Sequence, residues 1–238
     1  MILNHFTETH CHILPGIDDG SPDVETSISM IERLRLQGAQ TIIVTPHYYS
    51  DSISLQDFLT RRNAAYEKLA AALPDTSPKI VPGAEIFISR YLFSNDDLSG
   101  ICFGKERYAL IEHPFSETFG EKAYERLVTL ICDHGITPIL AHIERYSALM
   151  DSVKTLDSLL ELGCLTQVNI SSFADERRSV KKKLFKYLES GRIHLIGSDC
   201  HNLSSRPPAY EDGAKEIIKK CGRATLEKLL NNSNELLQ

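Results

Sequence analysis

The sequence lacks several patterns that would place it in a common class of protein. No Cys-x-x-Cys pair occurs among its six cysteines, at positions 11, 102, 132, 164, 200 and 221. It therefore carries neither a zinc-finger motif nor a thioredoxin motif. Scattered cysteines of this kind predict reduced thiols rather than a disulfide framework.

Long apolar runs and an excess of basic residues are also missing. A membrane helix needs about 20 apolar residues, and no run approaches that length. The opening Met-Ile-Leu-Asn-His-Phe lacks the basic and apolar regions of a signal peptide. We therefore expect a cytoplasmic protein without membrane insertion. The net charge of −6 argues against a nucleic-acid partner, because proteins that bind phosphate backbones usually carry a basic surface.

The composition is that of an ordinary globular protein. Hydrophobic residues make up 42% of the 238 residues and charged residues 24%, which fits one large domain over residues 1–238 or two small ones. Several β-rich runs are continuously apolar, as in Thr41–Val44, which predicts strands buried on both faces of a parallel sheet. The expected strands are His5–His10, Thr41–Thr45, Lys79–Ala84, Tyr108–Glu112, Thr137–His142, Thr166–Asn169 and His194–Ser198.

Amphipathic stretches with helix-capping signals lie between these strands. Ser21 is expected to cap the first helix and Gly38 to end it, while Gly135, Gly163 and Gly191 stand where later helices should end. Strands that alternate with helices predict an α/β barrel or a doubly wound sheet. The expected helices are Pro22–Gln37, Leu55–Leu73, Glu121–His134, Val153–Leu162, Glu176–Glu189 and Asp212–Leu230.

Histidines and carboxylates follow the ends of most of the expected strands. In a barrel the carboxyl ends of all strands meet around one face, where catalytic groups gather. A doubly wound sheet concentrates its chemistry at one crevice, so this distribution favours the barrel. The residues are His10, His12, His47, Glu85, Glu112, His142, Asp199 and His201, with Asp18 or Asp19 in the first loop.

This set of side chains has the chemistry of a metal site. His10 and His12 are two residues apart, so in an extended segment both point to the same side, and Asp199 and His201 repeat the spacing. The set is too large for one ion and suffices for two or three. Imidazole mixed with carboxylate suits Mn²⁺, Zn²⁺ or Fe²⁺ better than Ca²⁺ or Mg²⁺.

Two arginines stand close to these residues in the sequence. Arg145 follows His142 within a short loop, and Arg206 follows His201 in the same way. A planar guanidinium beside hard cations is suited to binding phosphate oxygens through two hydrogen bonds. The pattern therefore predicts a metal-dependent hydrolase that acts on a phosphate.

The same motifs resemble the polymerase-and-histidinol-phosphatase (PHP) superfamily. More narrowly, they look like its branch of bacterial manganese-dependent protein-tyrosine phosphatases from capsule and exopolysaccharide loci. The resemblance covers most of the chain, from about His10 to Pro208. The matching segments are Thr9–Gly20, Gly83–Ile86, Ala141–Tyr146, Gln167–Asn169, Ser198–Asn202 and Arg206–Pro208.

This resemblance implies a distorted, TIM-like (β/α)₇ barrel with up to three metal ions, foremost Mn²⁺, with Fe²⁺, Zn²⁺ or Co²⁺ as alternatives. Arg145 and Arg206 would bind the phosphate. Alignment on Asp-Asp-Gly favours Asp19 over Asp18. Other branches have histidine at the Glu112 position, whereas here His113 follows it, as a supporting residue or a substrate contact. The implied ligands are His10, His12, Glu85 and Asp199 for one ion, Glu85, Glu112 and His142 for a second, and Asp19, His47 and His201 for a third.

The implied reaction is hydrolysis of phosphotyrosine on the tyrosine-rich tail of a bacterial tyrosine autokinase. As a hypothesis, a metal-bound hydroxide attacks phosphorus in line, the arginines absorb charge, and a phenolate leaves. Only Cys200 has an arginine six positions later, Arg206, and it lies inside the Asp199-Cys200-His201 segment. The resemblance implies a metal-bound hydroxide there rather than a cysteinyl-phosphate route. The sequence leaves open whether the protein forms a homo-oligomer.

Alternative functions use the same residues. They are a small-molecule phosphatase of the histidinol-phosphate type, an amidohydrolase-like metal hydrolase and a non-enzymatic docking module. Tyr48, Tyr49 and Tyr146 could line the mouth of the site, while His5, His134 and His194 are expected to be structural. The basic stretch Arg177–Lys183 is expected to be a solvated helix face, with a dock for an acidic tail as the alternative.

Overall fold

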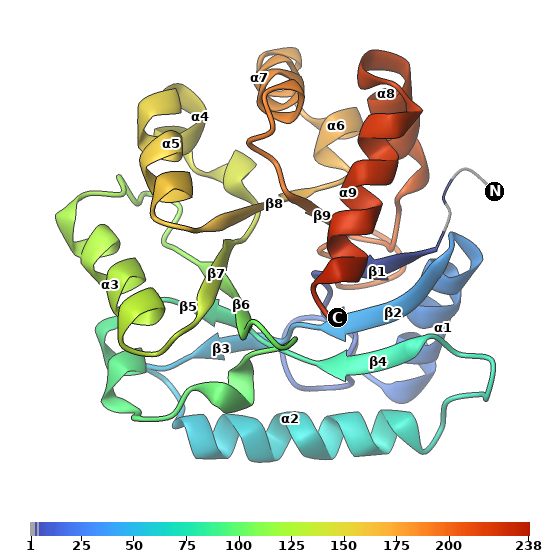
Figure 1. Ribbon diagram of the computed structural model, residues 1–238. Coiled ribbons are helices and arrows are strands. Elements are labelled where there is room, and N and C mark those ends of the chain that lie inside the picture. Colours follow the sequence, from blue (N-terminus) through green and yellow to red (C-terminus); the bar gives the residue numbers. More distant parts are fainter. Residues whose placement is uncertain (1–2, 4) are drawn as a thin grey trace.

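Two parallel sheets form the centre of the molecule. The computed structural model describes residues 3 and 5–238 (Figure 1). The first sheet has the strand order β1-β2-β4 and the second the order β3-β5-β6-β7-β8-β9. The strands are β1 Phe6–Glu8, β2 Ala39–Val44, β3 His47–Tyr49, β4 Lys79–Pro82, β5 Glu85–Phe87, β6 Tyr108–Glu112, β7 Thr137–Leu140, β8 Leu165–Asn169 and β9 Leu195–Gly197.

All the expected strands are present, but β2 and β4 are each followed at once by a further short strand, β3 and β5, that was not expected. Thr45 and Pro46 separate β2 from β3, and Gly83 and Ala84 separate β4 from β5. Proline has no N–H to donate, so regular pairing is interrupted at Pro46. Pairing resumes at once, because the Glu85 N–H donates to the Pro46 carbonyl at 3.0 Å. These two chain segments therefore run through both sheets.

The first and last strands also meet beyond their ends. Cys11 and Cys200 form a parallel bridge. The Asp199 N–H donates to the His10 carbonyl at 2.7 Å, and the His12 N–H donates to the Cys200 carbonyl at 2.9 Å. These bonds bring the segment that follows β1 beside the segment that follows β9.

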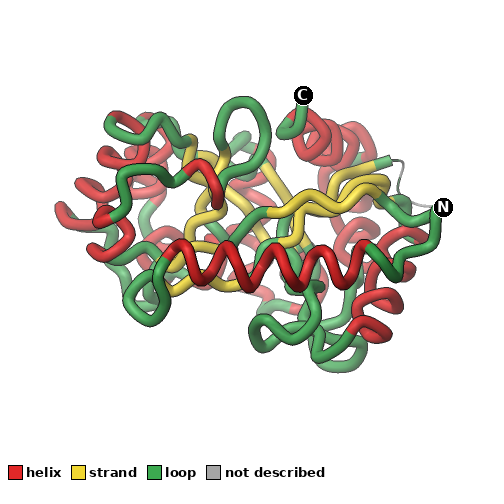
Figure 2. Tube along the Cα trace, turned by 90° about the horizontal axis from the view of Figure 1, so that it is seen from below, coloured by secondary structure: helices red, strands yellow, loops and turns green. Residues whose placement is uncertain are grey.

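Helices cover the outer faces of the sheets, with α2 running along one side of the molecule (Figures 1 and 2). The helices are α1 Val24–Leu36, α2 Leu55–Ala70, α3 Glu121–Cys132, α4 Ser147–Asp151, α5 Val153–Glu161, α6 Ser172–Asp175, α7 Arg178–Glu189, α8 Glu211–Cys221 and α9 Arg223–Glu235, with 3-10 turns η1 Arg90–Ser94, η2 Ser99–Ile101 and η3 Ile143–Arg145.

Two details of the expected helices were wrong. The last expected helix is divided at Gly222, whose φ of 84° cannot continue a right-handed helix. Asp23, not Ser21, caps α1: its side chain accepts from the Thr26 N–H, whereas the Ser21 hydroxyl donates to the Asp23 carbonyl. Gly38 and the other three stop glycines have positive φ, as expected.

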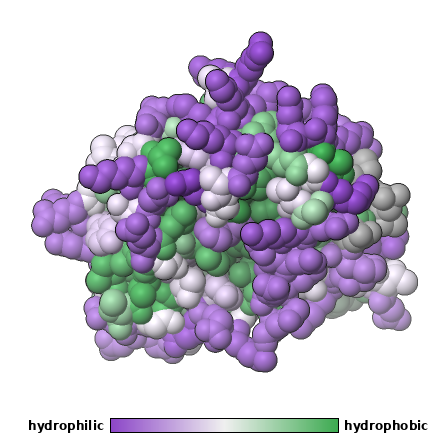
Figure 3. Space-filling view, turned by 45° about the horizontal axis from the view of Figure 1, so that its top comes forward, coloured by the Kyte–Doolittle hydropathy of each residue, from purple (hydrophilic) through white to green (hydrophobic). Residues whose placement is uncertain are grey.

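Strand β2, which was expected to be buried on both faces, is buried in the structure. Ile42, Ile43 and Val44 on β2 have no exposed surface. The molecular face in Figure 3 is mostly hydrophilic, with smaller hydrophobic areas between the polar side chains. No helix in the described part of the chain is long and apolar enough to cross a membrane.

Candidate metal centre

Glu85 lies at the centre of a buried cluster of histidines at the carboxyl ends of the strands. Its Oε2 atom lies 3.2 Å from His10 Nε2, 3.1 Å from His12 Nε2 and 3.2 Å from His47 Nδ1. Its Oε1 atom lies 2.9 Å from His142 Nε2. The Glu85 side chain is 1% exposed. Residues from distant parts of the sequence thus meet around one carboxylate.

The other residues expected as metal ligands lie beside these histidines. Asp199 Oδ1 lies 3.3 Å from His10 Nε2, and Glu112 Oε1 lies 3.4 Å from His142 Nε2. Three groups have potential ligand atoms within 4.8 Å of one another: His12, Asp19, His47 and His201; His10, His12 and Glu85; and His47, Glu85 and Glu112. His12 and His47 each belong to two groups, whereas the resemblance implies one ion for each. Glu85 also belongs to two groups, as a bridging ligand would, but the expected ligands His142 and Asp199 belong to none of the three.

In three histidines, the hydrogen bond made by Nδ1 determines the tautomer and therefore whether Nε2 carries a lone pair. His10 Nδ1 faces Gln167 Oε1 at 3.2 Å, and His12 Nδ1 faces Asp18 Oδ2 at 2.8 Å. His201 Nδ1 faces the Asp199 carbonyl at 3.0 Å. Each Nδ1 must donate to these acceptors, so each Nε2 of a neutral ring presents a lone pair.

These lone pairs point at carboxylates. The Nε2 atoms of His10 and His12 face Glu85, and His201 Nε2 lies 3.4 Å from Asp19 Oδ1. Two acceptors at such distances need a proton or a metal ion between them. Burial opposes a charge on His12, yet Asp18 and Glu85 raise its pKa well above the usual value. The centre therefore attracts positive charge, and its nitrogen and oxygen donors fit transition-metal ions.

Other histidine nitrogens in the cluster lack a hydrogen bond. His47 Nδ1, His142 Nδ1 and His201 Nε2 are buried and make none among the described residues. His47 Nδ1 is close to Glu85, but not in hydrogen-bonding geometry. A buried polar atom without a partner costs about 1–3 kcal/mol, so unpaired nitrogens at His47 and His201 are another feature that a metal ion would explain.

The adjacent acids Asp18 and Asp19 have different positions. Asp18 accepts from the N–H groups of Gly20 at 2.9 Å and His47 at 3.0 Å while it holds His12. Asp19 is 66% exposed and lies 3.5 Å from His47 Nε2. Only Asp19 belongs to one of the three groups. The geometry therefore agrees with Asp19 as the candidate ligand and makes Asp18 the residue that orients His12.

A chain of amides supports the cluster from β8. Gln167 Oε1 accepts from the His142 N–H at 2.7 Å, and Gln167 Nε2 donates to Asn169 Oδ1 at 3.1 Å. Asn169 Nδ2 in turn donates to Asp199 Oδ2 at 2.8 Å. Sequence reasoning assigned no role to these two residues. The available signal was two polar residues, two positions apart, at the end of a buried strand.

Both expected arginines reach the same carboxylate. Arg145 Nη2 and Arg206 Nη2 each lie 2.7 Å from Asp199 Oδ2. The side chains are 35% and 37% exposed. They line a cavity of about 180 Å³ together with Asn169, Ser198 and Asp199. The geometry places two cations at an opening beside the candidate metal ligands, where an anionic group could enter.

His113 belongs to a different environment from Glu112. Its ring lies 4.8 Å from that of Phe119 and meets Tyr146 edge-on. Burial lowers the pKa of His113 to about 3. Glu112 belongs to a candidate metal group and His113 to none of those formed by the described residues.

The histidines and tyrosines outside the cluster were partly predicted. His5, His134 and His194 belong to none of the metal groups found among residues 3 and 5–238. Of the tyrosines suggested for the mouth, Tyr48 and Tyr146 are buried, at 1% and 0% exposure. Tyr49 is 38% exposed, with its ring 5.3 Å from that of His47.

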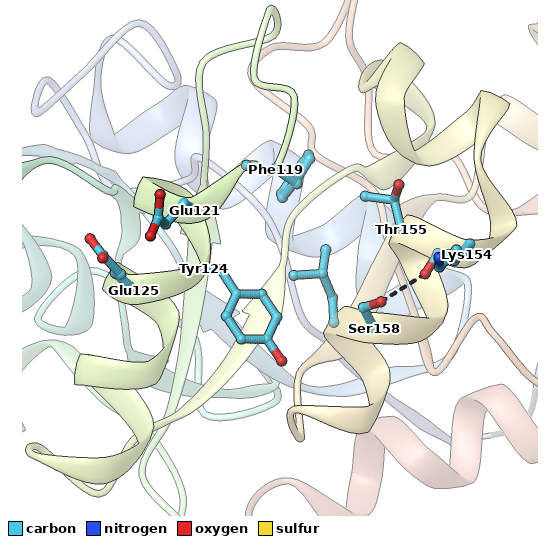
Figure 4. A pocket seen from close by; sticks show the side chains of 9 residues that line it. Phe119, Glu121, Tyr124, Glu125, Lys154, Thr155 and Ser158 are labelled. Atoms are coloured by element: carbon cyan, nitrogen blue, oxygen red, sulfur yellow. Dashed lines mark hydrogen bonds between the residues drawn. The ribbon is translucent and has the colours of Figure 1, made fainter.

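A separate cavity lies between α3 and α5 (Figure 4). It measures about 530 Å³, and Phe119, Tyr124 and Leu159 contribute to its walls. None of its lining residues belongs to the metal cluster, and Phe119 packs against the buried ring of His113. This cavity therefore does not contain the candidate catalytic groups.

Comparison with known proteins points to one group of relatives. The family model described as "Capsular polysaccharide synthesis, CpsB/CapC" matches residues 6–238. Tyrosine-protein phosphatase CpsB of Streptococcus pneumoniae is 31% identical over 229 residues, which cover 93% of each protein. Tyrosine-protein phosphatase YwqE of Bacillus subtilis is 30% identical over 234 residues, covering 97% of this chain and 90% of YwqE.

Solved structures agree with these matches. One, from a study of B. subtilis YwqE and S. pneumoniae CpsB as "unique metal-dependent tyrosine phosphatases", superposes with a TM-score of 0.80 at 27% identity, covering 97% of this chain and 94% of that one. The phosphotriesterase homology protein of Escherichia coli reaches a TM-score of 0.55 at 12% identity, covering 99% and 98% of the two chains. The second likeness concerns the fold alone.

Proposed function

The chain belongs to the CpsB/CapC family of capsular polysaccharide synthesis, and from this we propose that it is a metal-dependent protein-tyrosine phosphatase. Its relatives CpsB and YwqE are tyrosine-protein phosphatases. The observation that carries the proposal is the set of imidazole lone pairs directed at Glu85 and Asp19, with Arg145 and Arg206 beside them. Candidate metal ligands and two guanidinium groups that can bind an anion are thus neighbours at one opening.

The proposed ligands follow the family resemblance. His10, His12, Glu85 and Asp199 would hold one ion; Glu85, Glu112 and His142 would hold a second; Asp19, His47 and His201 would hold a third. Mn²⁺ is the foremost candidate by that resemblance, since the mixture of imidazole and carboxylate donors suits Mn²⁺, Zn²⁺ and Fe²⁺ alike. Bound ions of this kind supply a nucleophile by lowering the pKa of water, and they neutralise charge on phosphate oxygens.

The protein's own residues orient the phosphate. Arg145 and Arg206 bind its oxygens and absorb the charge that grows as the ester bond breaks. Asp199 holds both guanidinium groups in place before substrate arrives, which reduces the entropy lost on binding. Asp18 and Gln167 keep His12 and His10 in the tautomers that present Nε2.

An exposed aromatic side chain adjoins this clamp. Phe115 is 54% exposed, and its ring lies 5.7 Å from that of His142. The guanidinium carbon of Arg145 lies 5.9 Å from the Phe115 ring centre. We assign Phe115 as an apolar contact for the phenol ring of phosphotyrosine, with Tyr49 across the cluster, because offset aromatic pairs are favourable.

We also propose that residues 1–238 form a single domain with a closed, distorted (β/α)₇ barrel. The bonds between the ends of β1 and β9, and the two chain segments shared by both sheets, support closure. The proposed substrate is the tyrosine-rich tail of a bacterial autokinase that regulates capsule or exopolysaccharide synthesis. The cytoplasmic location and the oligomeric state stay predictions.

The decisive test is an assay of the metal-stripped protein with Mn²⁺ added back in steps. A phosphotyrosine peptide and histidinol phosphate are compared as substrates. We expect activity to return with Mn²⁺ and kcat/KM to favour the peptide. The variants His10→Ala and Asp199→Ala should lose both activity and bound metal. Full activity in either variant, or a preference for histidinol phosphate, would contradict the proposal.

A further inference from the structure

A second cleft opens directly beside the candidate metal centre. It measures about 460 Å³ and shares Asp19 and His47 with the cluster. Helix α2 contributes Phe58 and Arg61, and the loop before α2 contributes Ile53. A substrate whose phosphate lies among the metal ligands would have its neighbouring groups next to this cleft.

The wall of the cleft is apolar and firmly held. Phe58 is 3% exposed, and its ring stacks on Tyr48 at 4.6 Å between centres. Ile53 and Ile17 are partly buried and pack against the hydrophobic core. Tyr49 stands where the cleft meets the cluster, supported by Phe87 at 5.6 Å. Such a wall suits the backbone and aliphatic carbons of a peptide.

Arg61 gives this cleft a cation with no internal partner. Among residues 3 and 5–238, the Arg61 side chain makes no hydrogen bond or ion pair, and it is exposed. Its neighbour Arg62 has a different role, since it is buried and donates to the carbonyls of Gly83 and Gly100 at 3.2 and 2.7 Å. Arg61 is three residues after Phe58, so both lie on the same side of α2.

The charges of the cleft indicate what it can bind. Its acidic members, Asp18 and Asp19, lie at the metal cluster, where Asp18 is paired with His12. Arg61 is the only lysine or arginine among the described residues that line the cleft. A side chain placed beside Arg61 therefore meets an unpaired guanidinium, which favours a carboxylate and disfavours an ammonium group.

We infer that this cleft is a subsite for the peptide that flanks phosphotyrosine, and that Arg61 selects an acidic side chain in that segment. The inference rests on the proposed phosphatase function and adds a determinant of substrate choice. In an extended peptide successive residues advance by about 3.3 Å, so the subsite takes residues within a few positions of the phosphotyrosine.

The test compares phosphotyrosine peptides that carry glutamate, glutamine or lysine at each of the three positions on either side. For the metal-loaded wild-type protein, we expect one position at which glutamate raises kcat/KM about threefold or more over glutamine. Exposed ion pairs contribute about 0.2–1 kcal/mol, and that limits the effect to about fivefold. The ratio between peptides cancels any general loss of activity in a variant.

Arg61→Gln should bring this glutamate-to-glutamine ratio of kcat/KM to about one. Arg61→Glu should reverse the preference, so that the lysine peptide is cleaved faster than the glutamate peptide. Arg178→Glu is the matched control, because Arg178 begins α7 in the basic stretch and does not line the cleft. Its ratio should equal that of the wild type.

Three results would overturn the inference. They are a wild-type ratio of one at every position, an unchanged ratio in Arg61→Glu, or loss of the preference in Arg178→Glu instead. Cleavage of phosphotyrosine without any such preference overturns the subsite alone. Failure of the metal-loaded protein to cleave every phosphotyrosine peptide overturns the proposed function as well.

Discussion

Arg145 donates from Nη2 to Oδ2 of Asp199 at 2.7 Å, at the opening above the buried histidines. The same oxygen also accepts hydrogen bonds from Arg206 Nη2 and Asn169 Nδ2. The other carboxylate oxygen, Oδ1, faces His10 Nε2. One carboxylate thus lies between the candidate metal cluster and the candidate phosphate clamp. The two parts of the site are held at a fixed separation.

Replacing Arg145 or Arg206 by lysine should lower kcat/KM for a phosphotyrosine peptide by about a hundredfold. Lysine keeps the charge but loses the planar pair of donors that binds two phosphate oxygens, and groups that stabilise developing charge are worth about 10²–10³. Steady-state kinetics at saturating Mn²⁺ measure the effect. Arg192→Lys is the control, since Arg192 pairs with Asp157 at a partly exposed site. Equal losses in all three variants would contradict the assignment.

Asp18 and Asp19 should respond differently to substitution. Asp19→Ala removes a proposed ligand and should lower the number of bound ions by one, as measured by elemental analysis after gel filtration. Asp18→Asn removes the group that orients His12 and should keep all ions but weaken their binding, by about 10–100-fold. Titration calorimetry of the stripped protein measures that weakening. An ion lost in Asp18→Asn but kept in Asp19→Ala would reverse the two roles.

Glu112 and His113 provide a second adjacent pair for comparison. Glu112→Gln should abolish activity and reduce bound metal, because a proposed ligand loses its charge. His113→Leu should keep its full metal content, since the ring packs against Phe119 rather than the cluster. Its free energy of unfolding in urea should not fall, because leucine removes two buried ring nitrogens that make no hydrogen bond among the described residues. Metal loss in His113→Leu without loss in Glu112→Gln would show that histidine is the ligand here.

His194 should make the fold less stable in mild acid. Its Nδ1 accepts from the Thr166 N–H at 3.2 Å, and Thr166 Oγ1 lies 2.9 Å from it. Burial, aided by Lys228, lowers the pKa of His194. In the unfolded chain the pKa is about 6.5. As the pH falls below that value, the unfolded state takes up a proton that the folded state refuses, so stability decreases.

The measurement is urea unfolding of the stripped protein at pH 7.5 and pH 5.5. His194→Asn should lose less stability between the two pH values than the wild type. His5→Asn, at an exposed position, should behave like the wild type. An identical pH response in wild type and His194→Asn would contradict the prediction.

The strands could be predicted because their continuous apolar runs are favourable only when both faces of the sheet are buried. Ile42–Val44 has only apolar side chains, and it lies buried in β2 as expected. The continuation past Pro46 into β3 could not be foreseen, since a missing N–H normally ends pairing. Pairing resumes there because the partner segment stays alongside, with the Gly83 N–H donating to the Val44 carbonyl and the Glu85 N–H to the Pro46 carbonyl.

The candidate ligands could be predicted from their positions at strand ends, but their supports could not. Gln167 reaches both His10 and the backbone of His142, which depends on how β8 lies beside its neighbours. Asp18 differs from Asp19 only in the direction in which a loop turns its side chain. Spacing in a sequence gives no information on either point.

The bridge between Cys11 and Cys200 joins histidines from the beginning of the chain to an acid and a histidine near its end. During synthesis on the ribosome, the segment that carries His10 and His12 emerges long before Asp199 and Arg206. The nascent protein therefore has no complete centre until nearly all of the chain has left the exit tunnel. With the proposed ligands, loading with metal would mark completed folding, and a chain that ends before Asp199 would lack part of the centre.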